Sequence, residues 1–397
     1  KPNYVPCKIT DGEKIFDCNV RLKGDLEDHW FSKYRMSLRV QIKNGSIYGL
    51  QNFSIHKPRA RQFPYDQTFH KINAKIGGLS SYDQRFVNFK LNEKNWGVMN
   101  IEPLIDDNFI KNVGITYSGV FKISNQDNWR FNEKNKNSIL KEGYFISDPT
   151  IFFTQRGKDK IIMKNKDSRK LHGHIFYYLS SKNSLIFDRK KMIDSFVLSL
   201  CWGSLHVLKN SNSLYTWNSF TKKLEPILTD QNHWNDTKYV VNNLRKLPYE
   251  YLTLFKNNPI SKDEFLNSLV KIEKYLKYND PLKIANNLKS ENFPNDRKFL
   301  KSPINGNIIY IKNNTDKIIS WINQISSLNN FQKQNSDLKI ENYIKTIDNF
   351  IKVVHFTNGK IEIYNLISKP VFISKIKFKN KIIQINKKIK GSSQYSI

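Results

Sequence analysis

Two polar side chains near the middle of the chain are candidates for holding a divalent cation. Asp230 follows the apolar segment LEPIL, and Asn212 lies in the polar loop that precedes it. Segments 213–217 and 223–228 are predicted strands joined by a polar turn, and such a hairpin would let the amide and the carboxylate converge on one metal ion. Phosphoryl-transfer enzymes hold nucleotide-bound Mg²⁺ in this way. An aspartate after a strand is also a common cap or turn residue, so the pattern leaves both interpretations open.

An amphipathic helix is predicted immediately before this loop. Asp188 is a suitable N-cap, and Gly203 is the expected end of the helix. Apolar residues recur between them at helical spacing, which places one stripe against a core. The stripe consists of Ile193, Phe196, Val197 and Leu200.

The first part of the chain is predicted to be rich in strands. Segment 34–42 alternates apolar and polar side chains with the period of a half-buried strand. Pro58 ends the strand-forming pattern before a basic stretch, and Gly77 is expected to close the helix that follows. Strands are predicted at 19–22, 34–42 and 53–55, a helix at 65–76, and a hairpin from 85–91 and 97–104. This order of elements is that of the N-terminal lobe of a kinase-like protein.

Several segments between about residues 19 and 235 resemble, in order, a divergent branch of the CotH family, the spore-coat-protein-H-like kinases. They are RLKGDLEDHW, KYRMSLRV, LQNFSIHKPRARQ, NWGVMNIEPLIDDNFI, SGVFKI, LHVLKNSNSLYTW and KKLEPILTD. The resemblance implies an α+β fold of the two-lobed, atypical protein-kinase type. It also implies binding of ATP with Mg²⁺ or Mn²⁺, phosphorylation of secreted or surface proteins by active members, and an extracytoplasmic or cell-envelope location.

The resemblance assigns roles to residues around the expected metal. Asp230 matches the metal-binding aspartate of kinases, and Asn212 matches the loop amide that holds a second metal, with Asn210 as the alternative. Glu102 matches the acidic residue at the end of the second hairpin strand, near the expected position of adenine.

Three basic residues match positions that the family also keeps basic. One of Lys33, Arg39 and Arg61 is expected to neutralise the α and β phosphates, because lysine and arginine are the usual phosphate-binding side chains. The alternatives are that Arg39 lies on a solvated strand face and that Arg61 caps the following helical region. The alternative for Glu102, which precedes a proline, is that it only ends its strand.

The expected position of the catalytic base departs from the family pattern. Active members carry an aspartate a few residues before the loop asparagine. Here residues 206–210 are HVLKN, with no carboxylate. Either His206 replaces the base, since histidine exchanges protons near neutral pH, or the chain binds nucleotide without efficient transfer and acts as a surface scaffold. A buried, purely structural role for His206 is the third interpretation.

Composition limits the classes of partner. The 65 Lys and Arg against 35 Asp and Glu give a net charge of +30, which favours acidic partners. Lysine is scattered along the chain and no nucleic-acid-binding motif is found, so specific nucleic-acid binding is not expected. An anionic polysaccharide or a membrane surface fits the charge, and the phosphate acceptor would be a protein or a polysaccharide. No apolar run is long enough to span a bilayer.

Cysteine usage indicates neither a disulfide-rich scaffold nor a zinc site. Cys7, Cys18 and Cys201 form no CxxC pair. A bridge between Cys7 and Cys18 is expected if the chain is exported, and three unpaired thiols are expected otherwise.

Three regions are predicted along the chain. Residues 1–125 would form the β-rich N-terminal lobe, and 126–335 a mainly helical C-terminal lobe with the catalytic-loop-like segment 203–234. Residues 345–397 would form a small β domain, the start of a β-sandwich with an adhesive or structural role. Within the second region, helices are predicted at 248–255, 262–276 and 317–328, separated by Pro259, Pro281 and Pro303.

Overall fold

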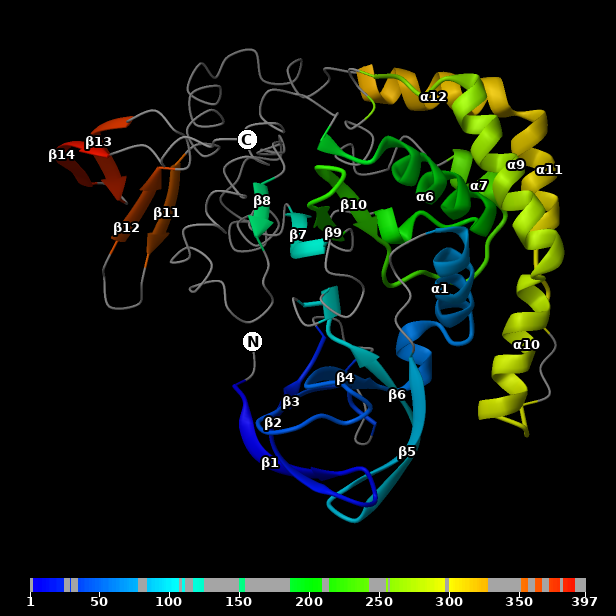
Figure 1. Cartoon of the computed structure of the whole chain (residues 1–397), viewed down its shortest axis with the longest axis horizontal. Coiled ribbons are helices and arrows are strands. Elements are labelled where there is room, and N and C mark those ends of the chain that lie inside the picture. The colour runs from blue at the N-terminus through cyan, green and yellow to red at the C-terminus, as the bar shows by residue number, and fades with distance from the viewer. Residues whose placement is uncertain are drawn as a thin grey trace.

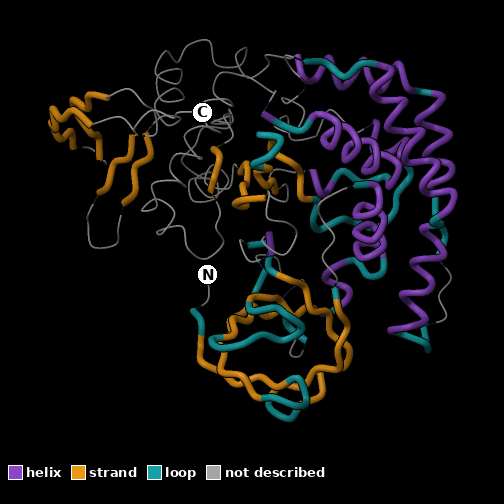
Figure 2. The backbone as a smooth tube through the Cα atoms, in the orientation of Figure 1, coloured by secondary structure: helices purple, strands orange, loops and turns teal. Residues whose placement is uncertain are grey.

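The computed structural model has a mixed α+β architecture (Figure 1), with most helices packed on one side of the molecule and the strands in an N-terminal sheet, a central sheet and the C-terminal hairpins (Figure 2). It describes residues 3–24, 29, 35–77, 84–106, 109–110, 117–124, 150–153, 186–208, 214–242, 255, 258–296, 300–327, 351–355, 361–365, 371–378 and 381–389. Among these residues no helix combines the length and apolarity that crossing a membrane requires.

The N-terminal part is a curled antiparallel sheet of six strands. The strand order is β1-β2-β3-β4-β6-β5, and a disulfide joins Cys7 and Cys18, which face each other in β1 and β2. β3 begins at Leu38, later than the alternation pattern predicts, and Arg35 before it has a left-handed backbone with φ +67°. The strands are β1 (Val5–Thr10), β2 (Ile15–Leu22), β3 (Leu38–Ile42), β4 (Asn52–His56), β5 (Arg85–Leu91) and β6 (Lys94–Pro103).

This sheet has one apolar face and one polar face, because successive side chains in a strand point to opposite sides. Residues paired directly across strands share a face, and one such row runs through Arg21, Arg39, Ser54 and Glu102. Arg39, Ser54 and Glu102 are all buried. The opposite face forms a core from residues that include Cys18, Leu38, Val40, Ile42, Phe53, Ile55, Met99 and Ile101.

A short turn and a helix connect the sheet to the rest of the molecule. The 3₁₀ turn η2 (Pro58–Arg61) follows β4, and the helix α1 (Tyr65–Ile76) follows the turn. α1 has the predicted bounds and ends at Gly77, whose φ of +102° favours glycine.

A second sheet and a buried helix flank the chain segments that lead to His206 and Asp230. The sheet order is β10-β9-β7-β8, from β7 (Tyr117–Ser124), β8 (Thr150–Phe153), β9 (Leu214–Asn218) and β10 (Lys223–Ile227). β7 lies within the predicted N-terminal lobe but pairs with β9. The hairpin of β9 and β10 confirms the predicted pair of strands.

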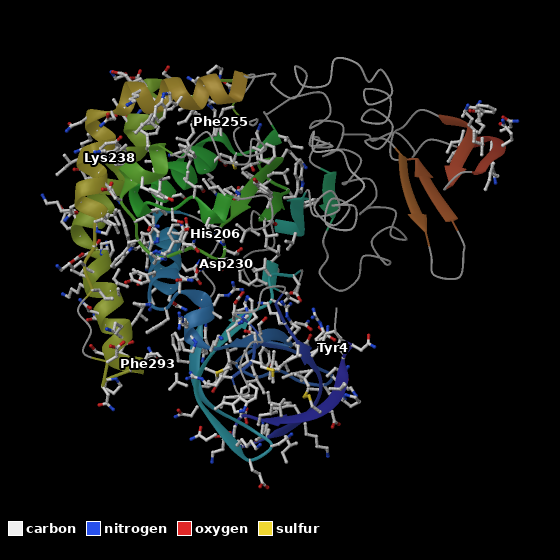
Figure 3. The ribbon with its side chains drawn as sticks, turned by 180° about the vertical axis from the view of Figure 1, so that it is seen from behind. Tyr4, His206, Asp230, Lys238, Phe255 and Phe293 are labelled. Atoms are coloured by element: carbon white, nitrogen blue, oxygen red, sulfur yellow. A yellow bond between two sulfur atoms is a disulfide. The ribbon has the colours of Figure 1, made fainter. Side chains whose placement is uncertain are left out.

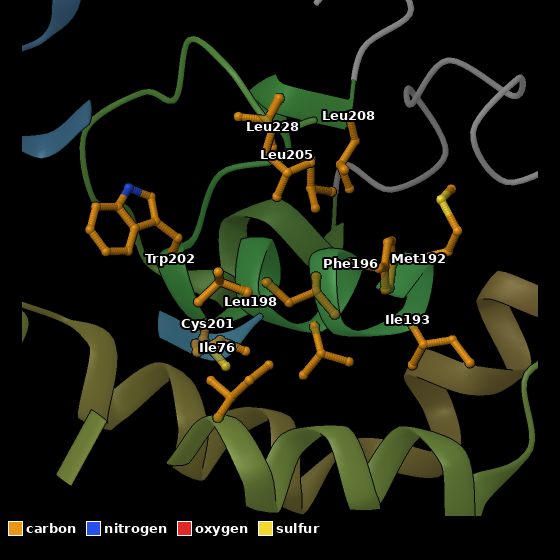
Figure 4. Packing of buried hydrophobic residues seen from close by; sticks show 14 of the residues in the cluster. Ile76, Met192, Ile193, Phe196, Leu198, Cys201, Trp202, Leu205, Leu208 and Leu228 are labelled. Carbon is orange, nitrogen blue, oxygen red and sulfur yellow. The ribbon is translucent and has the colours of Figure 1, made fainter. Parts of the chain in front are cut away.

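The helix α6 (Arg189–Trp202) lies in the centre of the larger core (Figure 4). It confirms the predicted ends: the Asp188 side chain accepts a hydrogen bond from Lys191 N, and Gly203 is the C-cap with φ +71°. Phe196 and Leu200 are fully buried, as the apolar stripe predicts.

Further helices pack around α6 and α1 or against one another. They include α7 (Thr237–Asn242), α9 (Lys262–Tyr278), α10 (Pro281–Asn292), α11 (Ile304–Asn313) and α12 (Thr315–Ser327). Two of the prolines predicted to separate helices do so and also begin the next helix: Pro281 occupies the first turn of α10, and Pro303 is the N-cap of α11. The predicted helix at 248–255 lies almost entirely outside the described residues.

The C-terminal strands pair as hairpins. β11 (Ile351–His355) pairs with β12 (Ile361–Asn365), and β13 (Val371–Phe378) pairs with β14 (Lys381–Ile389). In the described part of this segment the two pairs are separate two-stranded sheets, and the predicted β-sandwich is not seen.

Candidate functional site

An arginine joins the polar face of the N-terminal sheet to the predicted metal-binding aspartate. Arg61 donates from Nε to Glu102 Oε2 (2.5 Å) and from Nη2 to Glu102 Oε1 (2.9 Å). Its Nη1 donates to Asp230 Oδ1 at 2.6 Å. This bidentate pairing fixes the plane of the guanidinium, so that one edge is held by Glu102 and the other faces Asp230.

The position of Arg61 follows from local backbone structure. Pro58 has no N–H for a strand and begins η2, which turns the chain out of the sheet. Arg61 is the last residue of this turn and is buried beside the end of β6. The basic segment after β4 therefore contributes one specific arginine to the site.

Asp230 lies beyond the end of β10 with a left-handed backbone, φ +66°. Non-glycine residues rarely adopt this conformation, which costs on the order of 1 kcal/mol. The Asp230 side chain retains 35% of its exposure, so one side of the carboxylate faces solvent. Partial burial acts to raise the pKa of Asp230, but the nearby Arg61 charge and the neighbouring His206 outweigh it and hold the pKa well below its ordinary value.

The loop that carries Asp230 is tied to the end of α6. Trp202 Nε1 donates to Asn232 O at 2.9 Å, and Gln231 Nε2 donates to Ser204 O at 3.1 Å. Gly203 permits this close approach: a Cβ at that position would lie 1.9 Å from Asn235 O. β10, the loop after it and the C-terminal end of α6 therefore fix the position of Asp230.

Glu102 also contacts a lysine and a histidine of the polar face. His56 Nε2 lies 3.0 Å from Glu102 Oε2 and 2.8 Å from Lys23 Nζ, and Lys23 Nζ lies 3.8 Å from Glu102. Burial acts to raise the pKa of Glu102, but Arg61, Lys23 and the hydrogen bond from His56 hold it well below its ordinary value. Burial and the charge of Lys23 hold the pKa of His56 well below its ordinary value.

His206 lies next to Asp230 between the sheet and the helices (Figure 3). It belongs to the short 3₁₀ turn η4 (His206–Leu208), and its Nε2 is 3.7 Å from Asp230 Oδ2. The side chain is 25% exposed, in contrast to the fully buried Val207 beside it. A partly exposed imidazole at this place differs from the buried structural histidine that was one of the interpretations.

The structure thus brings together four of the predicted site residues. Arg61, Glu102, Asp230 and His206 are linked by direct contacts, and Arg39 lies two strands from Glu102 in the same cross-strand row. Arg39 is buried, so it does not lie on a solvated face. Lys33, Asn210 and Asn212 lie outside the described residues.

The charges around Asp230 oppose a bare metal ion. Among the described residues, no three His, Cys, Asp or Glu side chains form a cluster that could hold a metal. Mg²⁺ typically takes one or two carboxylates and completes its shell with phosphate oxygens and water. A bare cation at Asp230 would be repelled by Arg61, whereas the phosphates of a bound nucleotide would neutralise both charges.

Lys23, His56, Asp66 and Gln231 contact the site but were not identified from the sequence. Lys23 and His56 lie in the segments RLKG and IHKPRAR, at alternate-strand positions on the same face as Glu102. A search for polar residues in register with Glu102 would have found them. Asp66 and Gln231 carry no comparable signal, because their contact joins distant parts of the chain.

No protein-family model matches the chain, and no curated protein matches it significantly.

Proposed function

We propose that this chain is a CotH-like, atypical kinase-fold protein that binds ATP with Mg²⁺ or Mn²⁺ between the N-terminal sheet and the helical part. The observation that carries the proposal is the position of Arg61, held by Glu102 and directed at Asp230. In kinases a cation fixed by a glutamate binds the phosphates, and a neighbouring aspartate binds the metal. Here Arg61 would bind phosphate, Glu102 would fix Arg61, and Asp230 would bind the metal.

Each residue has a distinct role in this proposal. Asp230 is the protein carboxylate that holds the divalent cation, and Arg61 binds phosphate oxygens through the edge that faces Asp230. Glu102 acts through Arg61 as a positioning residue, although adenine contact was expected from the family. Lys23 and Arg39 add positive charge on the same face, which lowers the energy of a bound triphosphate.

In phosphoryl transfer His206 would have one role, as the base that takes the proton of the acceptor hydroxyl. The acceptor hydroxyl oxygen would form a bond to the γ-phosphorus while the bond from that phosphorus to the bridging oxygen of ADP breaks. His206 Nε2 would take the hydroxyl proton, and its place beside Asp230 supports that role. Positioning and charge neutralisation supply most of the rate enhancement in such reactions. The acceptor would be a protein or a polysaccharide.

Calorimetric titration of the chain with Mn·ATP tests the proposal directly. The parent chain is expected to bind Mn·ATP and to bind Mn²⁺ alone weakly, because Arg61 opposes a bare cation. Asp230→Asn is expected to abolish the metal-dependent part of binding. Asp17→Asn, which removes an exposed carboxylate in β2, is the control for the change in charge. Equal heats for the parent and Asp230→Asn would refute the proposal.

The second candidate is a catalytically inactive surface protein that binds an anionic polymer. Two observations favour it: residues 203–212 supply no carboxylate base, and Lys375, Lys387 and Lys388 are exposed on β13 and β14. The Cys7–Cys18 disulfide supports folding in an oxidising compartment, as expected for a cell-envelope or extracytoplasmic protein. Transfer of ³²P from labelled ATP to the chain or to an acceptor would exclude this alternative, and salt-sensitive polymer binding without transfer would support it.

A further inference from the structure

A buried aspartate of α1 holds the backbone next to Asp230. Asp66 is completely buried, and its Oδ1 accepts the backbone N–H of Gln231 at 2.7 Å. Gln231 follows Asp230 directly and is itself completely buried. A buried backbone N–H requires a partner, and the left-handed conformation of Asp230 directs this one away from any strand or helix. Asp66 therefore accepts the hydrogen bond from the Gln231 N–H, which this backbone conformation leaves without a partner in a strand or helix.

The orientation of the Asp66 carboxylate is fixed from the N-terminal sheet. Its Oδ2 accepts from Gln84 Nε2 at 2.7 Å. Gln84 cannot reverse its amide without losing partners, because its Oε1 accepts from Gln67 Nε2 at 2.6 Å and from Asn100 Nδ2. His70 Nε2 lies 3.2 Å from Asp66 Oδ1, one helical turn away. The carboxylate is thus held by groups from the sheet, from α1 and from the loop.

We infer that Asp66 is a positioning residue for Asp230: it holds the left-handed backbone that directs the Asp230 carboxylate toward Arg61. This inference rests on the proposed function for the identity of the ligand, a divalent cation with a nucleotide. Residues that orient a metal ligand typically change metal affinity about 10- to 100-fold when they are removed. In this inference Asp66 acts through Asp230 and not by contact with metal or nucleotide.

Replacement of the carboxylate tests this role. Asp66→Ala is expected to raise the Kd of Mn·ATP about 10- to 100-fold, while the Kd of ATP measured without metal stays unchanged. Thr68→Ala is the matched control in the same helix, because the Thr68 hydroxyl donates to Pro64 O, one turn earlier in the chain, and not to the Asp230 loop in the described part of the structure. The control is expected to lower stability and to leave both Kd values unchanged.

A double variant separates position from charge. Asp66→Asn/Gln84→Glu keeps an oxygen for the Gln231 N–H and lets the new amide at position 66 donate to the new carboxylate at position 84. That carboxylate still accepts from Gln67 and Asn100. Recovery of the parent Kd for Mn·ATP supports the positioning role, and a Kd as high as that of Asp66→Ala overturns it. If Asp66→Ala does not fold, the double variant is compared with Gln84→Leu. Weaker binding of Mn·ATP is then expected in Gln84→Leu and not in the double variant.

Hydrogen exchange at the Gln231 amide gives a readout that needs no nucleotide. Exchange is expected to be slow in the parent, faster in Asp66→Ala and slow again in the double variant. Unchanged exchange in Asp66→Ala overturns the inference. If the parent chain does not bind Mn·ATP, the proposed function fails by that result alone, and the exchange rates still decide whether Asp66 fixes the Asp230 backbone.

Discussion

The substitution Glu102→Gln probes the ion pair on which the site depends. The Arg61 and Glu102 side chains are 10% and 9% exposed, and the pair is bidentate. Removing one partner of a buried ion pair typically costs about 3 to 5 kcal/mol. Glutamine keeps the volume of the side chain and one acceptor oxygen, and Arg61 keeps Asp230. We therefore expect the free energy of unfolding to fall by about 3 kcal/mol, at the lower end of that range.

The effect should depend on pH in a defined direction. The pKa of Glu102 is lowered in the folded chain, so its ionisation stabilises the fold above the unfolded pKa of about 4.3. That stabilisation is lost as the pH falls from the unfolded value through the lower folded value. The difference in stability between the parent and Glu102→Gln should be constant from about pH 6 to 8 and should shrink in acid below the unfolded pKa.

Urea denaturation followed by tryptophan fluorescence measures this difference. Trp202 and Trp234 lie in the core beside the Asp230 loop and report on its unfolding. A cycle with Arg61→Met and the double variant isolates the pair, and a coupling energy of at least about 1 kcal/mol is expected. Glu13→Gln, on the exposed turn between β1 and β2, is the control. Additive single-variant losses, or a pH-independent difference, would refute the reasoning.

Two further predictions concern stability and thiols. Gly203→Ala should destabilise the chain by about 3 kcal/mol, because its φ is +71° and a Cβ would meet a backbone oxygen of the opposite loop at 1.9 Å. Gly306→Ala in α11, with open space around the position, should instead be neutral or stabilising, and thermal melting compares the two. A thiol reagent should find no reactive cysteine in the native chain, because burial raises the pKa of Cys201 to about 12. It should find one in urea and three after reduction, since Cys7 and Cys18 are bridged; three in urea without reductant would contradict the disulfide.

Much of the local structure was predictable from sequence, because its determinants lie within a few residues. The N-cap Asp188 and the C-cap Gly203 define α6, and Gly77 ends α1 at the predicted position. Period-two alternation indicated β3, although this strand starts only at Leu38, after the left-handed Arg35. β1 and the first half of β2 were not predicted. Helices that begin at prolines were missed because proline was interpreted as a separator.

The assembly of the site depended on tertiary structure. Sequence alone indicated Asp230, Arg61 and Glu102 as separate candidates with several interpretations each. Arg61 and Asp230 are 169 positions apart, and only the packing of the sheet against α1 and the loop brings them within a hydrogen bond. Burial then determined which charges pair, because an ion that loses water must find a partner of opposite charge. No local pattern encodes that requirement, so the sequence determined the candidates and the fold decided which of them meet.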